Sequence, residues 1–125
     1  MANPNIVNVT SILGETSYLT PSDTVANLLL DNAAASGKVY KINQIVASNV
    51  DGSSAVNTTV SITTQDAGAG TVYPIVSTVS VPADASLIVV DKTTAIYLME
   101  DKSIIVTSGT ASKIAYTISY EVIED

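Results

Sequence analysis

The chain has 125 residues, of which 46% are hydrophobic and 14% charged, and its formal net charge is −7. It contains no His, Cys, Trp or Phe, and its five basic residues are all Lys. The chain therefore lacks His as a proton shuttle, Cys as a thiolate nucleophile and Arg as a bidentate ligand for anions. Without Cys it also forms no disulfides. This composition argues against most enzymes, and the few dispersed lysines argue against a surface for nucleic acid or anionic membrane.

The length fits one domain over residues 1–125, and the hydrophobic share predicts a packed aliphatic core. The start of the chain lacks the basic and apolar regions of a secretory signal. The longest apolar runs, such as residues 28–30 and 87–90, are as short as single strands and cannot cross a bilayer as a helix. We therefore expect a soluble protein made in the cytoplasm, without a membrane partner.

The first third of the chain leaves two interpretations open. Residues 5–13 are predicted as a strand that ends at Gly14. Beyond it, Ser22 and Asp23 could cap a helix over residues 25–35 that stops at Gly37. The alternative is a strand over residues 24–30 followed by a loop. The many short strands that follow, at about ten-residue spacing, favour the strand.

Alternation of β-branched and polar residues is clearest in three later segments, residues 38–49, 56–63 and 114–122. The turn between the first two contains Asp51 and Gly52. Further strands are predicted at residues 71–81, 86–90, 95–98 and 103–107. Pro74 places the first of these at a sheet edge or a bulge.

Eight or nine short strands with regular turns predict an all-β fold, an antiparallel β-sandwich of the jelly-roll or immunoglobulin-like kind. No residue pattern in it indicates catalysis, a cofactor or a metal. The segment 51–54 lacks the spaced carboxylates of a calcium loop, and the acidic residues Glu100 and Asp101 are expected at a solvated corner. Lys102 and Ser103 are neighbours in a strand, so their side chains point to opposite faces and cannot form a dyad.

Several segments, however, follow a pattern that resembles small β-sandwich virion proteins of tailed bacteriophages. They are residues 37–42, 45–52, 79–87, 96–104 and 118–121. Lys102 departs from that pattern, which favours an acidic or small residue there. The resemblance spans most of the chain and implies a structural part of the particle, with no catalytic residue.

Among such parts, a capsid decoration (cement) protein on the capsid surface fits a small acidic sandwich best. The resemblance implies the major capsid protein as partner and self-association, with a trimer favoured. The acidic net charge argues against direct contact with nucleic acid. The alternatives are a neck, tail or baseplate subunit and a carbohydrate-binding adhesin module. We expect contacts through an extended arm at residues 1–9 and through end loops. The predicted contact residues are Asn3, Pro4, Asn5, Ile6, Asn49, Asp51, Ser53, Gly68, Gly70 and Tyr73.

Overall fold

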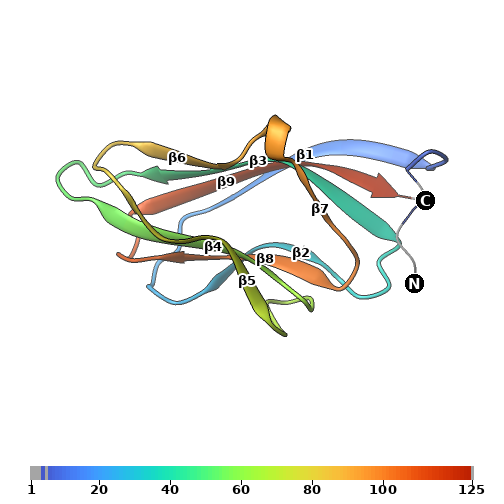
Figure 1. Ribbon diagram of the computed structural model, residues 1–125, viewed down its shortest axis with the longest axis horizontal. Coiled ribbons are helices and arrows are strands. Elements are labelled where there is room, and N and C mark those ends of the chain that lie inside the picture. Colours follow the sequence, from blue (N-terminus) through green and yellow to red (C-terminus); the bar gives the residue numbers. More distant parts are fainter. Residues whose placement is uncertain (1–3, 5, 125) are drawn as a thin grey trace.

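Two antiparallel sheets face each other in the computed structural model of the chain, which describes residue 4 and residues 6–124 (Figure 1). The first sheet contains, in spatial order, β1 (Ser11–Leu19), β9 (Ile114–Glu124), β3 (Lys38–Asn49) and β6 (Ser86–Val90), with β7 (Ile96–Leu98) also paired to β3. The second contains β2 (Asn27–Asn32), β8 (Lys102–Ser108), β4 (Val56–Thr63) and β5 (Val72–Val81). The predicted β-sandwich is thus confirmed.

The strand order distinguishes between the two kinds of sandwich. β6 and β7 lie on the same side of β3 and are separated by a single 3₁₀ turn, Lys92–Thr94, so they act as one interrupted strand. The two sheets then read 1-9-3-6/7 and 2-8-4-5, with most successive strands in opposite sheets. This is the order of a jelly roll, which is built from two Greek keys. The immunoglobulin-like alternative has a different strand partition.

The core is formed by every second side chain of the strands, which points into the space between the two sheets. In β9 the side chains of Ile114, Tyr116 and Ile118 face inward and are fully buried, and they belong to the same hydrophobic core as Ile104 and Val106 of β8 in the other sheet. Each residue buried in this way contributes roughly 1.5–3 kcal/mol from removal of apolar surface. Within residues 6–124 no helix is long and apolar enough to cross a membrane.

The core's largest fully buried side chain, Tyr116, carries a polar group that must be satisfied. Its hydroxyl donates to the backbone carbonyl of Thr107 at 2.9 Å and pairs with the hydroxyl of Thr58. Burial raises the pKa of Tyr116, and the hydrogen bond to Thr58 opposes that rise. The hydroxyl is therefore held neutral between the two sheets.

Replacement of Tyr116 by Phe should lower the free energy of unfolding by about 1–3 kcal/mol, because it leaves the buried Thr58 hydroxyl and Thr107 carbonyl without this partner. Urea unfolding monitored by circular dichroism measures the loss. The control is Tyr73→Phe, since the Tyr73 side chain is 58% exposed and its substitution should be neutral. Equal stability of Tyr116→Phe and wild type would contradict this assignment.

Most predicted strands are present, but the first was wrongly placed. The segment that could have been a helix contains strand β2, as favoured. The strand expected at residues 5–13 instead spans Ser11–Leu19, and residues 6–10 form turns and bends. Gly14 does not end it, because nine consecutive pairs with β9 carry the strand through the glycine, which pairs with Glu121. Tertiary pairing here overrides the weak strand preference of glycine.

Pro74 lies where it was predicted to lie. It is in β5, which is an edge strand of the second sheet, and it pairs with Ser61 beside two register shifts. An edge position leaves the missing N–H of proline without a structural cost, because no ladder partner needs it.

Candidate interaction surface

The predicted contact residues lie at opposite ends of the sandwich. Residues 50–55 precede β4 and residues 64–71 follow it, so the length of that strand separates the two loops. The start of β1 pairs with the end of β9, whereas Asn49 pairs with the beginning of β9 at Ile114. In Figure 1 the 50–55 loop is at the left and the start of β1 is at the right. The structure therefore does not bring the predicted residues together in one surface.

Asn49 supports the first loop from inside. The side chain is only 3% exposed. Its amide nitrogen donates to the backbone carbonyls of Val81 at 2.9 Å, Ser54 at 3.0 Å and Pro82 at 3.2 Å. Its carbonyl oxygen accepts from the backbone N–H of Asp51 at 2.8 Å. This side chain joins the turn before β4 to the end of β5 and is not itself available to a partner.

The Asp51 carboxylate closes the same turn. One oxygen accepts from the Ser53 backbone N–H at 2.9 Å, the Ser53 hydroxyl at 3.0 Å and the Ser54 backbone N–H at 3.2 Å. These bonds, those from Ser53 first, lower the pKa of Asp51. A carboxylate held in this way organises a turn. Across residues 4 and 6–124, no three His, Cys, Asp or Glu side chains form a group that could hold a metal ion.

Acid should weaken this turn. Because the pKa of Asp51 is lowered in the folded state, its contribution to stability is full above the unfolded pKa of about 3.9 and is lost as the pH falls through the folded value. We expect Asp51→Asn to lose less stability than wild type between about pH 4 and pH 2. Thermal unfolding of wild type and Asp51→Asn across this range tests it. Parallel curves for wild type and Asp51→Asn would contradict the prediction.

The second loop, residues 64–71, contains Gly68 and Gly70, both at positive φ. A Cβ at Gly70 would lie 2.3 Å from the Thr64 hydroxyl, so only glycine fits there. The Gly68 N–H donates to the Ser103 hydroxyl at 2.9 Å. The loop is thereby fastened to β8 and presents a defined shape.

Carboxylates hold the loops at this end in place. Backbone N–H groups donate to them in three separate bonds: Ala67 to Asp31 at 2.8 Å, Ala34 to Asp66 at 3.2 Å, and Asp66 to Asp101 at 3.1 Å. Glu100, expected at a solvated corner, is instead 8% exposed and accepts from the Gly37 N–H at 3.3 Å. The acidic residues at this end are therefore parts of the scaffold.

Lys102 and Ser103 also form hydrogen bonds within the fold. The Lys102 ammonium donates to the Thr64 carbonyl at 3.2 Å, and the Ser103 hydroxyl pairs with that of Thr63 and contacts the Gln65 carbonyl at 3.2 Å. Both side chains therefore help to hold the start of the 64–71 loop against β8.

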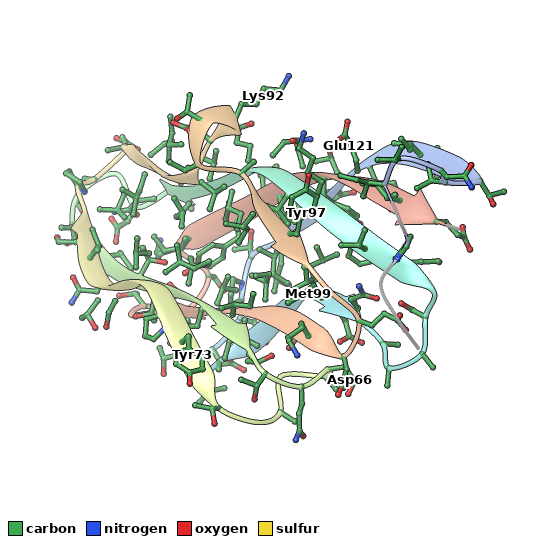
Figure 2. The ribbon with its side chains drawn as sticks, turned by 45° about the vertical axis from the view of Figure 1, so that its right-hand side comes forward. Asp66, Tyr73, Lys92, Tyr97, Met99 and Glu121 are labelled. Atoms are coloured by element: carbon green, nitrogen blue, oxygen red, sulfur yellow. The ribbon has the colours of Figure 1, made fainter. Side chains whose placement is uncertain are left out.

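The start of the chain forms an apolar hollow on the outer side of the first sheet. Its volume is about 280 Å³, and it is lined by Pro4, Ile6, Val39, Tyr97 and Met99. Pro4 and Val39 are buried, whereas the other three side chains are 43–50% exposed. Figure 2 shows Tyr97 on β7 and Met99 just beyond it. Of the predicted arm contacts, Ile6 is therefore accessible, and Asn3 and Asn5 lie outside the described residues.

The remaining predicted contact, Tyr73, lies on β5 and is 58% exposed. It is far from Tyr97 in Figure 2. The two rings therefore do not form one platform.

Sequence reasoning missed the strand edge of β1. Residues 11–16 are all exposed, among them the apolar residues Ile12 and Leu13. One signal was present in the sequence: neither face of residues 11–19 is consistently apolar, as expected of a strand that neither layer covers.

Comparisons with known proteins add little to this geometry. No protein-family model matches the chain, and no curated protein sequence matches it. A solved chain from Bacillus endospore appendages, described as forming a novel family of disulfide-linked pili, aligns with a TM-score of 0.44 and 16% identity. The alignment covers 91% of this chain and 88% of that one. Similarity at this level carries no argument about function.

Proposed function

We propose that this protein is a non-enzymatic structural protein of a tailed-phage particle, a capsid decoration protein that bridges major capsid subunits as a homo-oligomer. One observation supports a contact function above all. The carboxylates of Asp31, Asp51, Asp66 and Asp101 accept backbone hydrogen bonds within the fold, while exposed apolar side chains lie along β1 and around the hollow under Pro4. Surfaces of this kind serve association.

The charge of the chain supports the choice of partner. With five Lys and twelve acidic residues, it complements a basic protein surface and repels nucleic acid. A jelly roll by itself does not imply a role, since the same fold is used for unrelated functions. The resemblance to virion proteins over most of the chain is what directs the proposal to a phage head.

A neck, tail or baseplate subunit is the nearest alternative, and copy number separates it from decoration. The experiment is quantitative mass spectrometry of purified phage particles, with this protein measured against the major capsid protein. Decoration predicts hundreds of copies per particle, whereas a tail component predicts tens or fewer. Absence from the particle would refute both assignments.

The adhesin alternative depends on exposed aromatic rings. Tyr73 and Tyr97 are both exposed, but they lie on different strands and apart from each other (Figure 2). A sugar-binding face needs aromatic rings that lie close enough together to contact the same ligand. Glycan-array binding by the isolated protein would favour the adhesin over decoration.

A further inference from the structure

β1 is a long strand with one free edge. It pairs with β9 through nine residues in unbroken register, and within residues 6–124 no other strand pairs with it. Ile12 and Leu13 are each 57% exposed and Tyr18 is 81% exposed. The strand therefore presents unpaired backbone groups flanked by apolar side chains, a combination that favours addition of another strand.

The other sheet edges in the described part of the chain are interrupted. β5 contains Pro74, two register shifts and Thr78 at a φ of 50°. β2 has six residues and a register shift between Leu28 and Leu30. On the far side of the first sheet, β6 and β7 are separated by the 3₁₀ turn Lys92–Thr94. Prolines, bulges and short strands are the features by which natural proteins prevent edge pairing.

β1 carries none of these protective features. It contains no Lys and no Pro, and Glu15 is its sole charged residue. Val25 and Leu28, on the adjacent side of the sandwich, are a further two exposed apolar residues. An unprotected edge among interrupted ones indicates that something pairs with it.

We infer that β1 binds β1 of a second copy of this chain, antiparallel, to form a two-fold dimer with one continuous sheet. The occupant follows from the other edges: because they are interrupted, the only regular edge that a second copy offers to β1 is its own β1. Such an isologous contact closes after two copies. It favours a dimer over the trimer expected from the resemblance, because a cyclic trimer would need β1 to meet a different edge.

The residues of β1 are complementary to themselves when the two strands are centred on Thr16. Opposite residues are then Leu13 with the partner's Leu19, Gly14 with the partner's Tyr18, and Glu15 with the partner's Ser17. Leu13 and Leu19 both pair with buried residues of β9, so these two apolar side chains lie on the same face and can pack together.

The other face fits equally well. Gly14 and Tyr18 pair with Glu121 and Thr117 of β9, which point away from the core, and a Cβ at Gly14 would meet nothing within 4 Å. The partner's Tyr18 can therefore lie over Gly14, an arrangement that compensates for a glycine in a strand. No like charges face each other in this register, whereas a pairing centred on Glu15 would place the two carboxylates opposite each other.

Sedimentation equilibrium of the full chain tests the dimer, and Leu13→Lys tests the surface. We expect a reversible dimer whose dissociation constant rises at least tenfold in Leu13→Lys. Ile88→Lys is the matched control, because Ile88 is 59% exposed on β6 of the same sheet, and it should dimerise like wild type. A monomer at concentrations up to about 1 mM, a trimer, or equal dimerisation of the two lysine variants would overturn the inference.

Because the chain has no Cys, a single introduced cysteine reports the register and does not depend on Leu13→Lys remaining folded. Thr16→Cys should form an intermolecular disulfide readily under mild oxidation, since two copies of Thr16 meet at the axis. Ser77→Cys, on exposed β5, should not. Equal cross-linking of both variants would overturn the inference. The two proposals fail separately. A monomer abundant in phage heads would refute the dimer and the self-association but leave the decoration role standing, and a dimer absent from particles would refute the decoration role but leave the dimer standing.

Discussion

Replacing Asn49 by Ala should lower the free energy of unfolding by about 3 kcal/mol, the largest loss that we expect from a single polar side chain here. The substitution removes the amide that contacts the carbonyls of Ser54, Val81 and Pro82 and the oxygen that accepts from Asp51. Asn49 is 3% exposed, so water cannot readily replace these bonds. Two or more buried backbone groups left unpaired account for a loss of this size.

Urea denaturation and thermal unfolding measure this effect, and the midpoint of thermal unfolding should fall by about 10 °C. Asn57→Ala is the matched control, because Asn57 is an exposed residue of the neighbouring strand β4 and its removal should change stability by less than about 0.5 kcal/mol. If the two alanine variants are equally stable, the Asn49 side chain does not support the turn.

Asn49 also shows where sequence reasoning reached its limit. Its position beside Asp51 and Gly52 correctly predicted a turn, because these residue types favour turns through local hydrogen bonds. From the same position, the Asn49 side chain was predicted to be exposed and to contact a partner protein. Burial of the side chain depends on the end of β5, some thirty residues later in the chain, and no local pattern reports such a long-range contact.

The strands also divide into those that a local pattern predicted and one that it did not. Those with a buried face, such as β3 and β4, were predicted at their observed bounds because one face packs on the core and imposes a period of two. β1 was misplaced because no such pattern marks it. Its limits are set by pairing with β9 near the other end of the chain, and Gly14 therefore looked like an end. The candidate dimer surface was missed for the same reason.

Deletion of residues 1–9 should abolish attachment to empty shells assembled from the major capsid protein. It removes Pro4 and Ile6 from the hollow that they form with Val39 and Tyr97. The sandwich itself should persist, because Thr10 still donates to the carbonyl of Glu124 at 2.9 Å and β1 keeps its nine pairs with β9. Co-sedimentation with shells measures attachment, and circular dichroism confirms the fold. A truncated protein that attaches normally would refute the role of the arm.

The same assay can determine which end of the sandwich faces the shell, because the predicted loop contacts lie at opposite ends of β4. Ala55 and Ala69 are both exposed, one in each loop, and Ala→Lys adds the same bulk and charge at either position. If the arm and the 64–71 loop contact the shell together, Ala69→Lys should weaken attachment at least tenfold and Ala55→Lys should leave it unchanged. The reverse result would place the 50–55 loop against the shell.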